Sequence, residues 1–390
     1  MLGSRSRDGH DEHTAHAGSG SIETMIREVL ANADIQINGR RPWDMQIHHP
    51  DTLARIATQR SLGLGESYMD GWWDCDALDE FAFRMLRAGG DGLSKNRWML
   101  ALQVIAHTLR NRQSLRRSRQ VAEKHYDLDN QLFELMLDDT MAYSCGYWKE
   151  ADTLHQAQLA KLDLICRKLE LEPGMTLLDI GCGWGSLLEY ATRHYGVRAQ
   201  GVTVSSEQAR LARERCAGLP VEILLQDYRA VSGRYDRVVS VGMFEHVGRR
   251  NYRTFMDTAL SLLKDRGLML LHTIGDNHSS NHHDPWINKY IFPNGELPSV
   301  KQIARAAEPG FVVEDLHNFG PDYARTLKAW DVNFQTHWPT IEHRYDPHFY
   351  RMWRYYLNLC AGAFRARNIQ LWQWVFSKPG HRSRAYRAPR

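Results

Sequence analysis

A short apolar run that ends in closely spaced glycines is the feature of this sequence best suited to chemistry. The run Met175–Ile180 stops at the turn Gly181–Gly185, and Leu187–His194 then has helical spacing. Glycine is needed where the backbone adopts a positive φ or approaches a ligand with no Cβ in the way. A buried parallel strand, a glycine turn and a helix N-terminus together predict a nucleotide-type pocket at the carboxyl edge of a sheet.

The residues around the turn indicate which nucleotide would bind. A dinucleotide site has the pattern G-x-G-x-x-G and an acid about 20 residues later. Here the sixth position is Ser186, and the next strand ends at Val202–Val204 without an acid. Asp179 precedes the turn, where it can meet the ammonium of an amino acid. The D-x-G-x-G-x-G spacing favours S-adenosylmethionine (SAM), as in class I methyltransferases, over a dinucleotide or a purely structural turn.

Further polar residues follow other predicted strands. Glu245 comes after a strand that ends near Val241, and His272 ends the next strand. Ligands bind at the carboxyl ends of strands in an open α/β sheet, so both are site candidates. Cys145 lies in a turn before the first predicted strand of the sheet, and Tyr323 follows the sixth. A lone cysteine is more often a small buried residue than a nucleophile, which leaves the role of Cys145 open.

A histidine-rich segment invites a metal hypothesis. His278, His282 and His283 lie near Asp276 and Asp284. Their spacing on one loop is irregular and unlike that of established metal sites. No metal site is predicted.

The candidate site residues lie on a region of the chain in which predicted strands and helices alternate. The predicted strands are Thr176–Ile180, Ala199–Val204, Val221–Leu225, Asp236–Val241, Leu268–Thr273, Phe311–Asn318 and Gln370–Ser377. The predicted helices are Leu187–His194, Ser206–Ala217, Tyr252–Lys264, Val300–Ala307, Tyr323–Trp338 and Pro347–Arg367. Repeated β-α units predict an α/β fold: a mostly parallel, Rossmann-like sheet of seven strands with helices on both faces. Asp276–Pro298 is long for a connection and is typical of an active-site lid.

Composition divides the chain before the sheet. Residues 1–20 have no apolar periodicity and are predicted to be a disordered tail. Residues 21–95 form a small α+β domain, in which Ser61–Trp73 is interpreted as a glycine-rich turn with aromatic residues for packing or docking. Residues 96–125 are a basic helical linker, either a solvated helix face or a patch for anionic lipid headgroups. Residues 126–390 are the catalytic domain.

Overall composition limits the partners. A net charge of +3 in 390 residues is too balanced to indicate nucleic acid, and no nucleic-acid partner is predicted. Six scattered cysteines and the lack of a secretory h-region favour a reducing, cytoplasmic location. No apolar run approaches the length of a membrane span, so membrane contact would be peripheral.

From Gln46 almost to its C-terminus, the chain resembles the bacterial cyclopropane-fatty-acyl-phospholipid synthases. The segments that carry the resemblance are SLGLGESYMDGWW (61–73), HYDL (125–128), YSCGYW (143–148), LLDIGCGWGS (177–186), LLQDYR (224–229), SVGMFEHVG (240–248), LLHTIG (270–275), DPWINKYIFPNG (284–295) and CAGAFRARNIQLWQ (360–373). The later part also resembles mycolic-acid cyclopropane synthases and certain plant N-methyltransferases. The N-terminal domain matches the phospholipid-acting branch, which favours unsaturated membrane phospholipids as the substrate.

The resemblance implies a reaction and a catalytic set. Family members transfer the SAM methyl group to a cis alkene of an acyl chain, and the resulting carbocation loses a proton as the ring closes. Bound bicarbonate is the base. In this sequence the bicarbonate would be held by Cys145, Glu245, His272, Ile274 through its backbone, and Tyr323. Glu245 would accept the bicarbonate proton, while His272 and Tyr323 would donate hydrogen bonds.

The resemblance also implies a SAM site. Its residues would be Tyr143, Ser144, Leu178, Asp179, Gly181, Gly183, Trp184, Gly185, Thr203, Gln208, Asp227, Tyr228 and Arg229. Gln208 would take the ribose role that an acid has in other relatives. One departure is Asp129, which stands where the family usually has glycine.

The resemblance also bears on partners, and two alternative functions stay open. The resemblance implies a homodimer associated peripherally with the inner face of the cytoplasmic membrane. One alternative keeps the fold but makes methyl-branched acyl chains or N-methylates a small amine. Another is a catalytically idle lipid-binding or SAM-sensing module, which would be expected to lack a site residue, and none is missing.

Overall fold

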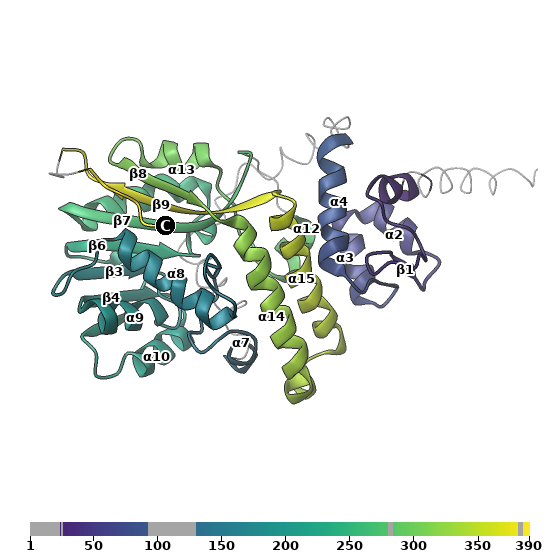
Figure 1. Ribbon diagram of the computed structural model, residues 1–390, viewed down its shortest axis with the longest axis horizontal. Helices are drawn as coiled ribbons and strands as arrows, with labels where there is room; N and C mark the ends of the chain where they lie inside the picture. Colours follow the sequence, from purple (N-terminus) through teal and green to yellow (C-terminus); the bar gives the residue numbers. More distant parts are fainter. Residues whose placement is uncertain (1–23, 25, 93–129, 280–283, 381–384) are drawn as a thin grey trace, which may run out of the picture.

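A computed structural model describes residues 24, 26–92, 130–279, 284–380 and 385–390 (Figure 1). The predicted tail (1–20), the basic linker (96–125), the HYDL segment and Asp129 lie outside the described residues. His282 and His283 lie outside them as well.

One large sheet dominates the described part of the chain. Its seven strands have the order β5-β4-β3-β6-β7-β9-β8. Their bounds are β3 (Thr176–Ile180), β4 (Arg198–Thr203), β5 (Val221–Leu225), β6 (Tyr235–Val241), β7 (Leu263–Asp276), β8 (Val312–Asn318) and β9 (Ile369–Ser377). Neighbours from β5 to β7 are parallel, and β9 is antiparallel to both β7 and β8. The predicted α/β class with a mostly parallel sheet is confirmed.

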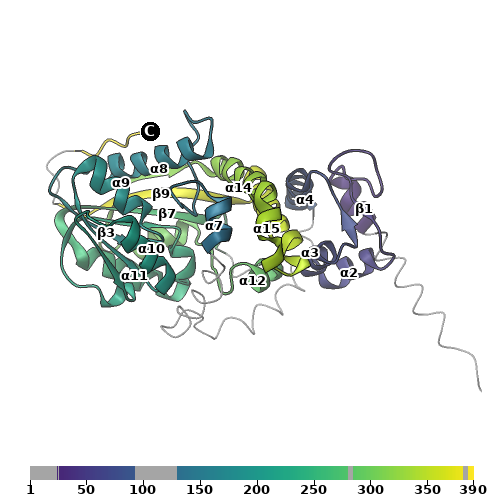
Figure 2. The same cartoon turned by 90° about the horizontal axis from the view of Figure 1, so that it is seen from below.

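Helices cover both faces of this sheet, as Figures 1 and 2 show. The helices are α8 (Leu154–Lys168), α9 (Ser186–Tyr195) and α10 (Ser206–Arg215) on one face, with α11 (Tyr252–Leu262) and α13 (Val300–Ala307) on the other. Leu177 packs into the core beneath α8 and α9, whereas Leu178 and Ile180 pack into the core beneath α11. Because both faces are covered, the strands β3, β6 and β9 are buried along most of their length rather than on alternate residues.

Two long helices connect the last strands. α14 (Gly320–Ile341) follows β8, and α15 (Pro347–Arg365) leads into β9. α14 begins three residues before its predicted start because Pro321 suits the first turn, where no backbone N–H is required. The short helices α7 (Asn130–Met136) and α12 (Pro285–Tyr290) lie near this pair, so the predicted lid contains a helix. None of the helices in the described ranges is long and apolar enough to cross a membrane.

The N-terminal module lies at one end of the molecule, against α12 and α15 (Figures 1 and 2). Its elements are β1 (Gln46–Ile47), α2 (Thr52–Gln59), α3 (Ser61–Met69), β2 (Trp73–Asp74) and α4 (Leu78–Gly92). β1 and β2 pair in an antiparallel manner. The Arg351 guanidinium on α15 donates hydrogen bonds to the carbonyls of Tyr68 and Trp73 and to the Asp74 carboxylate.

The interpretation of Ser61–Trp73 as a glycine-rich turn is wrong, because Ser61–Met69 forms helix α3. A Cβ on Gly63 would lie 2.4 Å from the backbone oxygen of Arg55 in α2. A Cβ on Gly65 would lie 2.4 Å from Cδ1 of Trp286 in α12. Each glycine costs a helix about 1 kcal/mol relative to alanine. Here the glycines allow close helix packing, and tertiary contacts outweigh the local preference.

Candidate functional site

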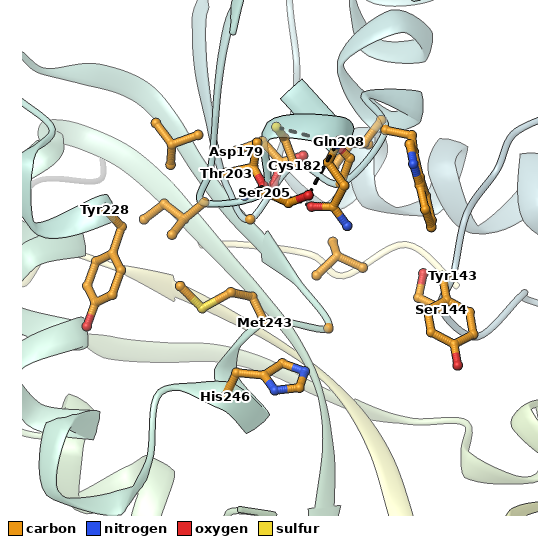
Figure 3. Close-up of a pocket in the computed structure, with 18 of the residues that line it drawn as sticks. Tyr143, Ser144, Asp179, Cys182, Thr203, Ser205, Gln208, Tyr228, Met243 and His246 are labelled. Carbon is orange, nitrogen blue, oxygen red and sulfur yellow. Dashed lines mark hydrogen bonds between the residues drawn. The ribbon is translucent and has the colours of Figure 1, made fainter. Parts of the chain in front are cut away.

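The glycine turn borders a cavity at the carboxyl ends of β3, β4 and β6 (Figure 3). Gly181, Gly183 and Gly185 have φ values of 90°, 53° and 84°. A Cβ on Gly181 would lie 2.8 Å from the Cβ of Met243. A Cβ on Gly183 would meet no atom within 4 Å, so this glycine leaves its side of the cavity open. The geometry therefore provides the left-handed glycine turn that the sequence predicts.

Most of the predicted SAM residues line this cavity. They are Tyr143, Ser144, Asp179, Gly181, Gly183, Trp184, Thr203, Gln208, Asp227, Tyr228 and Arg229. In Figure 3, Tyr143 and Ser144 approach from one side, Tyr228 lies on the opposite side, and Met243 and His246 lie below. The structure brings these residues together from four separate segments of the chain, 143–144, 179–184, 203–208 and 227–229.

Two predicted SAM residues do not line the cavity. Leu178 points into the core beneath α11 and is fully buried. Gly185 caps the N-terminus of α9, and a Cβ there would lie 3.2 Å from the Cβ of Ala212. Gly185 is therefore required where α9 packs closely against α10.

Hydrogen bonds preorganise the polar wall of the cavity. Thr203 Oγ1 donates to Gln208 Oε1 at 2.8 Å, and both side chains are buried. The Arg229 guanidinium donates to Asp227 Oδ1 at 2.7 Å, which holds the Arg229 pKa above its usual value. The Asp227 carboxylate therefore already has a cationic partner, while the amide nitrogen of Gln208 remains available at the cavity wall.

Asp179 and Lys161 place opposite charges in the same cavity. Both side chains are 2% exposed. Burial raises the pKa of Asp179 to about 7 and lowers the pKa of Lys161 to about 8. Lys161 was not predicted. It lies on the buried face of α8 with Ala157 and Ile165, and a lysine at helical spacing within an apolar face was the signal that could have identified it.

A second group of polar residues lies behind the cavity, around Glu245 in the 3-10 helix η3 (Phe244–His246). Glu245 Oε1 accepts a hydrogen bond from the Ile274 backbone N–H at 2.7 Å. Its other oxygen, Oε2, is buried and has no hydrogen-bond partner among the described residues. Burial raises the pKa of Glu245 to about 7.

His272 on β7 lies opposite Gln373 on β9. The Gln373 side-chain nitrogen lies 3.2 Å from His272 Nδ1. An amide nitrogen only donates, so Nδ1 accepts and the ring proton is on Nε2. Within the described ranges Nε2 has no partner. Burial, with the charges of Lys161 and Lys168, holds the pKa of His272 well below its usual value, so the ring is neutral.

Gln373 is a second residue that was not predicted individually, although it ends the segment CAGAFRARNIQLWQ. Its side chain is fully buried in a strand of mostly apolar residues. A glutamine flanked by apolar residues in such a strand was the available signal, since buried polar groups require partners.

Cys145 and Tyr323 are also buried, at 0% and 8% exposure. Burial holds the pKa of the Cys145 thiol well above its usual value, so the thiol is neutral and its Sγ donates to the Gly146 carbonyl. Burial also holds the Tyr323 pKa well above its usual value, and the neighbouring Cys145 and Glu245 reinforce this effect. Tyr323 therefore lies near both residues and can only donate or accept as a neutral phenol.

Thr326 on α14 anchors the segment that carries Cys145. Its Oγ1 accepts from the Gly146 N–H at 3.1 Å and from the Trp148 indole at 2.9 Å. Thr326 is fully buried. The predicted catalytic residues thus do not line the SAM cavity, but Cys145 follows Ser144, Glu245 precedes His246, and His272 pairs with Val241 at its edge.

The described residues contain no cluster of three or more His, Cys, Asp or Glu side chains arranged to hold a metal ion. His278 is exposed, and its backbone N–H donates to Asp276 Oδ1.

Comparison with known proteins places these features in a family. A family model described as mycolic acid cyclopropane synthetase matches residues 113–374. The cyclopropane-fatty-acyl-phospholipid synthase of Escherichia coli strain K12 is 55% identical over 354 residues, which is 91% of this chain and 93% of that protein. The tuberculostearic acid methyltransferase UfaA1 of Mycobacterium tuberculosis is 36% identical over 360 residues, 86% of this chain and 83% of that protein.

A solved structure gives the same result. The crystal structure of mycolic acid cyclopropane synthase CmaA1 complexed with SAH and CTAB has a TM-score of 0.64 and 35% sequence identity, covering 67% of this chain and 98% of that chain. The glycine-turn cavity, the seven-stranded sheet and these matches lead to one conclusion: the chain belongs to the cyclopropane synthase family and is a SAM-dependent methyltransferase.

Proposed function

We propose that the chain is a cyclopropane-fatty-acyl-phospholipid synthase, which transfers a methylene from SAM to the cis double bond of unsaturated phospholipid acyl chains. The observation that carries the proposal is the extent of the match to the E. coli protein. Residues 126–390 are about two thirds of the chain, but the match covers 91% and so includes much of the N-terminal module. The CmaA1 match covers 67% of the chain.

The cavity residues fit SAM. The open side of Gly183 leaves room for the backbone to approach a ligand, and the buried Asp179 offers a carboxylate to an ammonium group. The Thr203–Gln208 hydrogen bond orients the Gln208 amide for a ribose hydroxyl. Tyr143, Ser144, Trp184, Asp227, Tyr228 and Arg229 complete the proposed SAM site, with Gly181, Leu178 and Gly185 as structural supports of its turn. SAM supplies the electrophilic methyl group.

The buried polar group fits bicarbonate. Glu245 Oε2 and His272 Nε2 lack partners in the described part of the chain, and they offer one acceptor and one donor. In this proposal an ionised Glu245 accepts the O–H of the anion, while His272 Nε2–H, the Tyr323 hydroxyl and the Ile274 backbone orient it, with Cys145 closing one side. Bicarbonate would remove the proton that the methylated carbocation loses. Burial of these side chains excludes water that would otherwise quench the cation.

The substrate and location belong to the same proposal. Residues 21–95 would contact phospholipid, residues 96–125 would link that module to the catalytic domain (126–390), and residues 1–20 would remain a tail. The protein would bind the inner face of the cytoplasmic membrane peripherally as a homodimer. The packing of α3 on α12 supports a fixed relation between lipid contact and catalytic site, since Gly65 lies against Trp286, which is fully buried there.

A second candidate keeps the methyl transfer and changes the product to a methyl-branched chain. The match to tuberculostearic acid methyltransferase UfaA1 favours it, because that match covers 86% of this chain. Such a product would need a reductant to deliver hydride to the carbocation, so it differs from a cyclopropane in its cosubstrate requirement. N-methylation of a small amine remains an outcome of the test.

The test is mass spectrometry of unsaturated phospholipid vesicles incubated with the protein and methyl-labelled SAM, with and without bicarbonate. A gain of one CH₂ together with resistance of the product to ozonolysis would establish ring formation. Stimulation by bicarbonate would support the anion as base. A labelled chain that is two hydrogens heavier than the cyclopropane product, and that forms only when a hydride-donating reductant is added, would support the methyl-branching candidate. SAM binding with no labelled lipid would contradict both and direct the search to amines.

A further inference from the structure

Two buried side chains of opposite charge line the SAM cavity without pairing with each other. Lys161 projects from α8, and Asp179 projects from the end of β3. Each is 2% exposed. No ion pair within 4.0 Å joins them among the described side chains, although each charge affects the pKa of the other. A buried charge without a partner is costly, so this arrangement needs an explanation.

Both charged groups have unused hydrogen-bonding capacity. An ammonium has three donors, and in the described structure that of Lys161 makes one hydrogen bond, to Ser144 Oγ at 3.1 Å. Asp179 Oδ1 is buried and has no partner among the described residues. In Figure 3, Ser144 and Asp179 lie at separate points of the cavity wall. The cavity therefore offers a donor-rich positive pole and an acceptor-rich negative pole.

The structural role of Lys161 does not explain its presence. Gln158 lies one turn earlier on α8, and its side-chain nitrogen donates to the backbone carbonyls of Ala142 and Ser144 at 3.2 and 2.8 Å. Those bonds already hold the segment that carries Ser144. A neutral side chain at position 161 would pack there without the cost of burying a charge.

We infer that Lys161 binds the α-carboxylate of SAM, with Asp179 taking the α-ammonium, so that the two residues form a cradle for the zwitterionic end of the ligand. The inference rests on the proposed SAM site and assigns a residue for the carboxylate within it. Ser144 would orient the Lys161 ammonium through its hydroxyl. A ligand zwitterion would satisfy both poles at once, and its two charges would be bound more strongly in this buried site than in water.

Binding measurements can separate this role from a purely structural one. The probes are S-adenosylhomocysteine and its decarboxylated analogue, which keeps the amine and lacks the carboxylate. We expect the wild-type protein to bind S-adenosylhomocysteine at least about 10-fold more tightly than the analogue in calorimetry. Lys161→Met should weaken S-adenosylhomocysteine binding about 30-fold, or about 2 kcal/mol at 1.4 kcal/mol per tenfold, and change binding of the analogue less than about threefold.

The matched control is Gln158→Met, which alters the same face of α8 and leaves the charge at 161. It should weaken both ligands by similar factors, because its effect passes through the Ala142–Ser144 segment. Equal weakening of both ligands by Lys161→Met, or no weakening of either, would overturn the inference.

If Lys161→Met does not fold, the wild-type protein still provides a test. The methyl ester of S-adenosylhomocysteine removes the carboxylate charge, and wild-type protein that binds the ester and the free acid equally would overturn the inference. Failure of wild-type protein to bind S-adenosylhomocysteine at all would contradict the proposed SAM site instead. None of these outcomes depends on the lipid product.

Discussion

Glu245 combines a buried environment with an oxygen that has no partner. One carboxylate oxygen accepts from the Ile274 N–H, and the other is buried and has no hydrogen-bond partner among the described residues. A buried carboxylate with a raised pKa and a free oxygen is suited to accept a proton from a ligand that binds beside it. The neighbouring His272 is neutral and presents Nε2–H, so the two residues have complementary roles.

Glu245→Gln should reduce turnover with phospholipid vesicles at least about 100-fold, because general bases typically contribute 10²–10⁴-fold. The dissociation constant for S-adenosylhomocysteine should change less than about threefold, since Glu245 does not line the SAM cavity. Initial rates with labelled SAM and calorimetry measure the two quantities. Glu308→Gln, at the exposed C-cap of α13, is the control and should behave as wild type. Normal turnover in Glu245→Gln would remove Glu245 from the mechanism.

The pKa of Glu245 also gives opposite pH dependences for activity and stability. In the folded protein it lies at about 7, raised from 4.5. A raised carboxyl pKa stabilises the fold below the unfolded pKa, and this contribution is lost as pH rises from about 4.5 through 7. Activity should rise over the upper part of the same window, because the ionised form is the acceptor.

Glu245→Gln should therefore unfold less readily than wild type at pH 8, by about 1–3 kcal/mol, and show little difference at pH 4.5. Urea denaturation at the two pH values measures the free energy of unfolding. The pKa of Asp179 is also raised, but Asp179 is present in both wild type and Glu245→Gln. The difference in unfolding free energy between these two proteins therefore reports on Glu245 alone. An equal free-energy difference at both pH values would contradict the assignment.

At the scale of elements, α14 fixes the segment that carries the three site residues Tyr143, Ser144 and Cys145. Thr326 accepts hydrogen bonds from the Gly146 N–H and the Trp148 indole, and it donates to the Asp322 carbonyl. A valine of similar shape would leave two buried donors without an acceptor. Each such group costs about 1–3 kcal/mol.

Thr326→Val should lower the free energy of unfolding by about 2–4 kcal/mol and weaken S-adenosylhomocysteine binding, since Tyr143 and Ser144 belong to the same segment. Thr336→Val on the exposed face of α14 is the matched control, because that hydroxyl bonds only within its own helix. Chemical denaturation and calorimetry report the two effects. Equal stabilities for the two variants would show that α14 does not anchor this segment through Thr326.

The elements that could be predicted from the sequence were those set by local patterns. The strand Thr176–Ile180 was predicted with its observed bounds, because a short apolar run ended at glycines. Helix α3 was missed, because its glycines look like turn residues until Trp286, far along the chain, packs against Gly65. Lys161 and Gln373 were missed for the same reason, since their partners Ser144 and His272 come from other elements.

At the scale of the whole molecule, the N-terminal module is connected to the catalytic domain through a polar and aromatic interface. Glu66 on α3 accepts hydrogen bonds from Lys289 and Tyr290 on α12 and from Arg55 on α2. Tyr68 of α3 packs against Tyr355 of α15, with ring centroids 5.5 Å apart. Since α12 lies in the segment predicted to be a lid, we expect any movement of this segment to be coupled to movement of the module.

Gly65→Ala would place a methyl group 2.4 Å from Trp286 Cδ1 and force the two helices apart. We expect a loss of about 1–3 kcal/mol in the free energy of unfolding, typical of overpacking, and a larger loss of turnover on vesicles than of S-adenosylhomocysteine affinity. The control is Gly65→Ala made in a Trp286→Leu protein. There the added methyl group should lower the free energy of unfolding by less, because leucine is smaller than tryptophan. If Gly65→Ala lowered the free energy of unfolding equally with and without Trp286→Leu, α3 would not meet α12 at Gly65.

The position of β9 has a consequence for synthesis on the ribosome. β9 lies between β7 and β8, so β8 emerges first but cannot join the sheet until residue 377 has been made. Translation of residues 277–368 takes on the order of 5–20 s at 5–20 residues per second. During that interval the nascent chain exposes the unpaired edge of β7, a surface that chaperones recognise and that promotes aggregation. Messages truncated before residue 369 should therefore yield chains that are degraded rather than stable fragments with reduced activity.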